Sequence, residues 1–141
     1  MNTIPRIWLS IFVWIWFTGS ASAAGATSAE ELATKVQEAI TAKDAAAISA
    51  LYNWDGVPPD IAGQLQEAVE GMTGEPVLKA EVRPLPGDFP MVQELGDQKF
   101  VQNVELEGVI VLIYTEDGSV TGTMPYGMWD GRYYFSAPVP R

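Results

Sequence analysis

Apolar residues recur at helical spacing in the first part of the chain after residue 27. Ser28 and Glu31 have the Ser-x-x-Glu spacing of a capping box, which satisfies free backbone amides at the start of a helix. The apolar positions that follow lie three or four residues apart, as on one face of a helix. These positions are Leu32, Val36, Ala39 and Ile40. A junction follows at Lys43 and Asp44, and Asp44 is expected to cap a second, shorter helix. The apolar positions of that second helix are Ile48, Leu51 and Tyr52.

A third helix is expected to begin near Pro58, Pro59 and Asp60. Proline is tolerated in the first turn of a helix, and an acidic residue there suits the helix dipole. The apolar positions again have helical spacing: Ile61, Leu65, Ala68, Val69 and Met72. Gly71 and Gly74 are expected to end the helix. All three helices are amphipathic and therefore need a surface to cover.

The pattern changes from a helical period to alternation near residue 78. Apolar and polar residues alternate over 78–83, which predicts a strand with one face in water. Prolines and a glycine make 84–90 a loop, because proline cannot continue a central strand. Residues 91–98 show no clear period and are left unassigned.

The C-terminal third predicts an antiparallel meander. Residues 100–115 form one long strand in this interpretation, and Asp117-Gly118 and Asp130-Gly131 are two-residue hairpin signals. The hairpins enclose a strand over 120–129 and are followed by a last strand at 132–135. We therefore expect an α+β fold, in which two or three N-terminal helices pack on an antiparallel sheet of about four strands that ends in a meander.

The N-terminus has the three-part pattern of a secretory signal peptide. One arginine precedes an apolar run over 7–17, and small residues lead up to Ala23. The alternative is a permanent membrane anchor, but at about 1.5 Å per residue the run spans roughly 17 Å, against about 30 Å of bilayer hydrocarbon. We expect a signal peptide at 1–23, cleaved after Ala23 or the next residue, and a single domain at 24–141. The product is then exported to the periplasm or outside the cell, with no stable membrane anchor after cleavage.

Composition excludes several classes of chemistry. The chain has 141 residues, no Cys and no His, and a net charge of −10. Without Cys it has no disulfide framework, and without His it has no Ser-His-Asp or Cys-His nucleophile system and no His-ligated zinc. The acidic charge opposes binding to nucleic acid or anionic lipid, and its plainest interpretation is solubility. No calcium-loop, phosphate-loop or nucleophile-elbow motif is present, so we expect no metal and no cofactor.

The first candidate contact site is the helix end at 52–56, which gathers aromatic and acidic residues. Asp55 could act as a general base near Tyr52 or Trp54 if an apolar pocket desolvated it and raised its pKa. The structural alternative is that Asp55 and Gly56 form a turn after a helix and that Trp54 fills the core. The structural alternative is favoured here.

The second candidate contact site is the strand segment 124–129. It carries Met124, Tyr126 and Trp129, and Tyr and Trp suit binding surfaces because each combines an apolar ring with a polar group. Pro125 implies an edge strand or a bulge. The alternative is a strand whose alternate residues face the core.

Two segments resemble the nuclear transport factor 2-like superfamily, including its SnoaL-like members. Residues 37–52 resemble the opening helix pair of that superfamily, and 129–135 resemble its final hairpin, in which an aromatic strand follows an Asp-Gly turn. The resemblance implies a strongly curved antiparallel sheet wrapped around helices, with a pocket inside. The departure is a sheet of about four strands with an irregular segment at 84–99, which leaves a related but distinct fold open. Enzymes of the superfamily use a carboxylate base with Tyr or a second acid, or a His-Asp pair; the latter is impossible here.

Three functions remain open from the sequence. The leading hypothesis is an exported, non-catalytic domain that binds a small apolar ligand or an envelope protein partner. The first alternative is a carboxylate and tyrosine enzyme of the isomerase or dehydratase kind, with Asp55 and Tyr126 as its candidates. The second alternative is a structural or assembly component that pairs with a partner through an edge strand.

Overall fold

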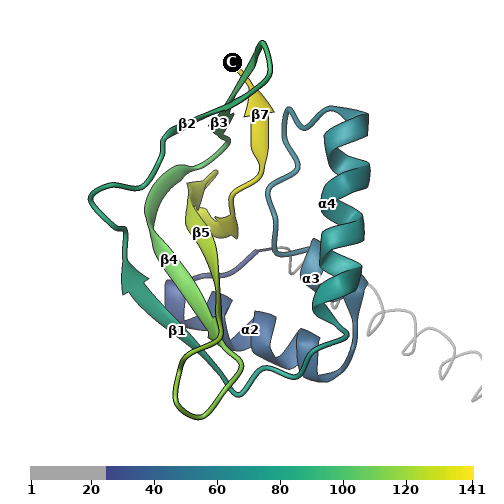
Figure 1. Ribbon diagram of the computed structural model, residues 1–141, viewed down its shortest axis with the longest axis vertical. Coiled ribbons are helices and arrows are strands. Elements are labelled where there is room, and N and C mark those ends of the chain that lie inside the picture. The colour runs from purple at the N-terminus through teal and green to yellow at the C-terminus, as the bar shows by residue number, and fades with distance from the viewer. Residues whose placement is uncertain (1–24) are drawn as a thin grey trace, which may run out of the picture.

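The computed structural model describes residues 25–141, so the expected signal peptide and its cleavage site at Ala23 lie outside the described residues. Within 25–141 three helices come first, as Figure 1 shows. Their bounds are Ala29–Thr41 for α2, Ala45–Ser49 for α3 and Pro59–Met72 for α4.

The helices begin where the sequence predicts. The Ser28 hydroxyl accepts a hydrogen bond from the Glu31 amide at 3.0 Å, and the Asp44 carboxylate accepts one from the Ala47 amide at 3.1 Å. These are N-cap bonds, which satisfy amides that have no partner inside the helix. Proline occupies the first turn of α4, as expected.

The main sheet is antiparallel, with strand order β1-β4-β5-β6. Its bounds are Lys79–Pro84 for β1, Glu105–Ile113 for β4, Thr121–Trp129 for β5 and Arg132–Phe135 for β6. The last three of these strands form the meander. The sheet curls around the helices (Figure 1), so the predicted α+β class, with N-terminal helices on an antiparallel sheet, is confirmed.

A second, small sheet was not predicted. Its strand order is β2-β3-β7. The bounds are Val92–Leu95 for β2, Gln98–Gln102 for β3 and Pro138–Pro140 for β7. The prediction of one strand over 100–115 is therefore wrong: the chain leaves the small sheet after Gln102 and enters the main sheet at Glu105.

The expectation that Pro125 marks an edge strand is also wrong. Its strand, β5, lies between β4 and β6. The Pro125 carbonyl accepts a hydrogen bond from the Ser136 amide at 3.0 Å, just beyond the last β5–β6 pair, Tyr126 with Phe135. Since the nitrogen and carbonyl of a strand residue face the same side, the missing N–H of Pro125 faces away from β4 and removes no bond to it. A bulge does occur, but in β4, between Leu106 and Gly108.

The hydrophobic core lies between the helices and one face of the main sheet. It contains large, fully buried side chains from both layers: Leu32, Val36, Ile40, Ile48, Val69, Ile110, Leu112 and Phe135. In the described part of the chain, no helix has the length and apolar character needed to cross a membrane.

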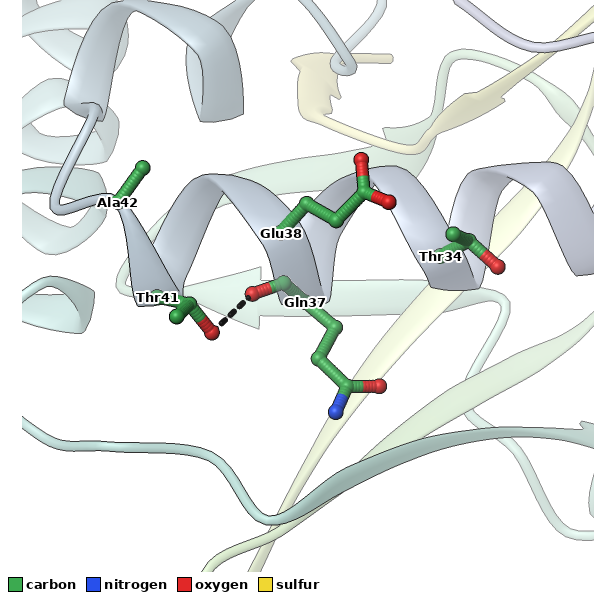
Figure 2. A pocket seen from close by; sticks show the side chains of 5 residues that line it. All are labelled: Thr34, Gln37, Glu38, Thr41 and Ala42. Carbon is green, nitrogen blue, oxygen red and sulfur yellow. Dashed lines mark hydrogen bonds between the residues drawn. The ribbon is translucent and has the colours of Figure 1, made fainter.

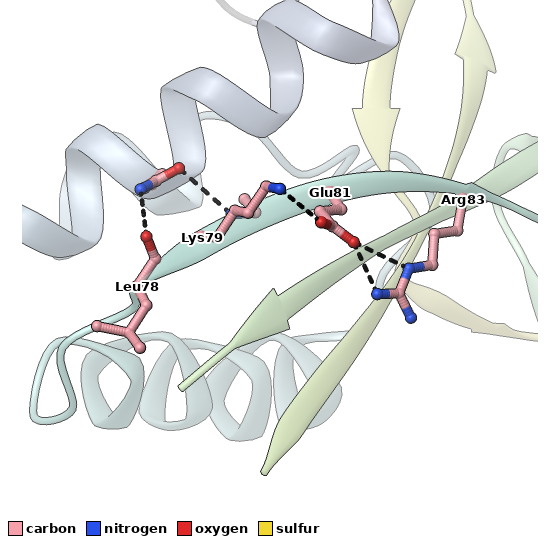
Figure 3. A network of polar contacts seen from close by, with 6 residues as sticks. Leu78, Lys79, Glu81 and Arg83 are labelled. Atoms are coloured by element: carbon pink, nitrogen blue, oxygen red, sulfur yellow. Dashed lines mark hydrogen bonds and ion pairs between the residues drawn. The ribbon is translucent and has the colours of Figure 1, made fainter. Parts of the chain in front are cut away.

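The outer edge of β1 is covered by one side chain of α2. The Gln37 amide donates to the Leu78 carbonyl at 3.2 Å and accepts from the Ala80 amide at 3.3 Å, as a neighbouring strand would (Figure 3). On the face of the same strand, the Glu81 carboxylate binds Lys79 at 2.8 Å and Arg83 at 2.7 Å. This edge is therefore closed to pairing where Gln37 lies.

Candidate functional site

A groove lies between α4 and the small sheet and has a volume of about 240 Å³. We call it the α4 groove. Six apolar residues line it: Ile61, Leu65 and Ala68 from α4, and Leu95, Phe100 and Pro138 from the small sheet. Elements far apart in the sequence thus meet at one apolar surface.

The groove exists because α4 does not bury its whole apolar stripe. Val69 is the buried residue of this helix, whereas Ile61, Leu65 and Met72 are half-buried. The helix packs on α3, where the Ser49 hydroxyl donates to the Gln66 side chain at 2.5 Å. The N-terminal half of the stripe therefore faces the groove rather than the core.

Two uncharged polar side chains complete the lining. Gln64 comes from α4 and Gln93 from β2, so the two amides lie on opposite walls. None of the lining residues carries a charge. An apolar surface with a few polar groups is typical of small-molecule sites.

A larger hollow of about 460 Å³ lies beside α2, but it is a poorer candidate. Figure 2 shows that its lining comes from α2 and the residue that follows it: Thr34, Gln37, Glu38, Thr41 and Ala42. The Thr41 hydroxyl donates a hydrogen bond to the Gln37 backbone carbonyl at 2.8 Å. The Gln37 side-chain amide is hydrogen-bonded to the edge of the main sheet, at Leu78. A hollow lined from one side, by a single stretch of chain, lacks the second, facing wall that the α4 groove has.

In the first predicted contact segment, 52–56, the structure brings the aromatic residues together but not Asp55. The Tyr52 ring lies 5.9 Å from that of Trp54 and 5.5 Å from that of Phe135, between centroids. The Trp54 indole donates to the Ser49 carbonyl at 2.8 Å. Burial raises the pKa of Tyr52 to about 12. Asp55, by contrast, is exposed to solvent.

The second predicted contact segment is divided between two environments. Met124 and Tyr126 are buried in the core and face the helices. Trp129 is 39% exposed at the far end of the strand and lies edge-on to Tyr134, with ring centroids 6.2 Å apart. The structure therefore does not join these residues into one surface.

None of the carboxylates is buried. All 18 acidic residues of the chain fall within the described range, and each is exposed or half-buried. Hydrogen bonds lower the pKa of Glu31, Glu81 and Asp117, mainly from Thr27, Lys79 and Ser119 respectively. Residues 25–141 also contain no cluster of three His, Cys, Asp or Glu side chains that could hold a metal ion.

Sequence reasoning missed most of the α4 groove. The apolar stripe of α4 was recognised, but its partners on the small sheet, such as Leu95 and Phe100, lie in or near a segment without a clear period. No pattern local to that segment indicates a strand that pairs with the C-terminus. Comparisons with protein-family models, curated proteins and solved structures found no match to this chain.

Proposed function

We propose that this chain is an exported, non-catalytic binding protein that holds a small apolar molecule in the α4 groove. The observation that carries the proposal is the set of six apolar side chains on two facing walls. Burial of apolar surface is worth about 25 cal/mol per Å², so such walls favour an apolar ligand over water.

The volume limits the size of the ligand. A cavity of about 150 Å³ binds benzene, and sites for drug-sized molecules begin at about 300 Å³. At about 240 Å³ the groove lies between them. The ligand is therefore about the size of a substituted benzene ring.

Export rests on the sequence of residues 1–23. Ala26 pairs with Tyr133 through two backbone hydrogen bonds, at 3.0 and 2.9 Å, and is fully buried. Cleavage after Ala23 leaves this contact in the mature protein. The proposed location is the periplasm or the outside of the cell.

A protein partner is the second candidate function, and a specific feature of β2 favours it. Met91, Val92 and Leu95 are 54%, 39% and 68% exposed, on or beside a strand at the edge of the small sheet. Such an edge offers free backbone groups to an added strand. The alternative of an enzyme with a carboxylate base and a tyrosine has no comparable support. Such an enzyme needs a buried carboxylate, and each carboxylate here is exposed or half-buried.

The test is a titration of the mature protein with toluene, followed by backbone amide NMR. We expect saturable shifts in α4 and in β2 and β3. Ala68→Trp fills the groove and should weaken binding at least tenfold. Ala46→Trp places the same side chain on the exposed surface of α3 and should bind toluene as the native protein does. Absence of saturable shifts, or equal binding by both variants, contradicts the proposal.

A further inference from the structure

Gln64 and Gln93 are free to bind a ligand. Both line the α4 groove, and within residues 25–141 neither side chain has a hydrogen-bond partner. Each amide offers two N–H donors and a carbonyl acceptor. A molecule between the two walls can therefore receive and donate hydrogen bonds without any charge.

The charged side chains of β2 and β3 lie on the face of the small sheet away from the groove. Glu94 and Lys99 alternate along their strands with Gln93 and Phe100, so they lie on the opposite face of the small sheet. There they approach each other to 3.8 Å. A charged ligand would find no counter-charge in the groove lining, and an anion would also enter the field of a chain with a net charge of −10.

We infer that the ligand is an uncharged molecule that joins an apolar body to one hydrogen-bonding group, such as a hydroxyl, carbonyl or carboxamide. This inference rests on the proposed function of the groove. The apolar body lies against Leu65, Leu95 and Phe100, and the polar group lies between the two glutamine amides.

Four probes with one ring and different substituents test this: toluene, benzamide, benzoate and benzylammonium, at pH 7 with the mature protein. Side-chain amide signals of Gln64 and Gln93 report contact directly by NMR. Each added hydrogen bond is worth about 0.5–1.5 kcal/mol, so benzamide should bind about threefold to tenfold more tightly than toluene. It should also bind at least tenfold more tightly than benzoate or benzylammonium.

A double variant, Gln64→Leu with Gln93→Leu, should bind toluene and lose the preference for benzamide. Gln98→Leu changes an exposed amide on β3 that does not line the groove, and should keep the preference. Toluene binding without a preference for benzamide, tighter binding of either ion, or a preference that survives in the double variant overturns this inference alone. If none of the four probes binds, the proposed function itself fails, and this inference with it.

Discussion

Two asparagines join the segment before α4 to the place where the two sheets meet. The Asn53 amide donates to the Asn103 carbonyl at 3.0 Å, and the Asn103 amide donates to the Asn53 carbonyl at 2.7 Å. The Asn103 side chain also accepts from the Ala137 amide at 2.9 Å. Asn53 is 4% exposed and Asn103 is half-buried, so these bonds are partly shielded from water. They join the segment before α4 to the chain between β3 and β4 and to the residue that precedes β7.

Replacing either asparagine should therefore destabilise the fold. Asn103→Ala leaves several backbone groups without partners, and unsatisfied buried groups cost about 1–3 kcal/mol each. We expect a loss of about 2–3 kcal/mol in the free energy of unfolding, measured with urea. Asn53→Ala should cost about 1–2 kcal/mol, and the double variant less than the sum, because the two side chains share one network. Gln98→Ala, an exposed amide on β3, is the control; a similar loss there would contradict this account.

Because of Tyr52, we expect the free energy of unfolding to fall at alkaline pH. Burial raises the pKa of its phenol to about 12, whereas an unfolded chain has a tyrosine pKa of about 10. The folded state thus holds the proton more tightly. The stability from this group is complete below about pH 10 and is lost as the pH rises toward about 12, by about 2–3 kcal/mol for a shift of this size.

Urea unfolding at pH 9 to 12 measures this loss. Tyr52→Phe keeps the ring contacts and removes the ionisable group, so its stability should fall less over the same range. The remaining slope is expected to come from groups such as Tyr114 and Tyr126, whose pKa values burial also raises. Equal slopes for the native protein and the variant would show that Tyr52 is not the group involved.

At the residue scale, roles that depend on neighbouring residues were predicted correctly. Roles that depend on partners far away in the sequence were not predicted. The caps at Ser28 and Asp44 follow from neighbouring residues, because an N-cap bonds to an amide two or three positions on. The roles of Asn53 and Asn103 depend on a partner 50 residues away. The burial of Tyr126 is non-local in the same way, because whether a strand residue faces solvent or core depends on what packs on the sheet.

At the scale of elements, the bulge in β4 requires a glycine at position 127 of β5. A Cβ atom on Gly127 would lie 1.9 Å from the Glu105 carbonyl oxygen, which is backbone and cannot move aside alone. The bulge between Leu106 and Gly108 brings the two strands this close. Glycine in a strand is typical where another backbone approaches closely.

Gly127→Ala should therefore cost at least about 3 kcal/mol in unfolding free energy, because the β4–β5 ladder must shift. Gly122→Ala is the matched control in the same strand. Its new Cβ atom would meet the Tyr114 ring at 3.6 Å, an ordinary contact. We expect a change of less than about 1 kcal/mol there. Comparable losses from both substitutions would contradict the role of the bulge.

The small sheet is the part of the fold that could not be predicted from the sequence. The helices and the main meander have strong periods and hairpin signals, and they were predicted. The small sheet joins a hairpin at 92–102 to three C-terminal residues, Pro138–Pro140, through long-range pairing. No local period encodes such pairing, and the prolines of β7 argue against a strand unless it lies at an edge, as β7 does. For this reason the sequence did not predict the wall of the α4 groove that the small sheet forms.

At the scale of the whole molecule, the proposed export gives a defined N-terminus. Cleavage after Ala23 leaves a chain that begins at Ala24, one residue before the described part of the fold. The intact mass of protein recovered from a secreting host measures this directly. We expect the mass of residues 24–141, or of 25–141 if cleavage falls one residue later. A recovered product that retains residues 1–23 would argue against a cleaved signal peptide.

The central claim is that the α4 groove holds a small apolar ligand, and its location can be measured without any substitution. Intermolecular NOEs between bound toluene and the protein methyl groups show where the probe lies. The account predicts contacts to Ile61 and Leu65 on α4 and to Leu95 on β2. Contacts to the hollow beside α2, at the Thr34 and Thr41 methyls, or no intermolecular contacts at saturating toluene, would contradict it.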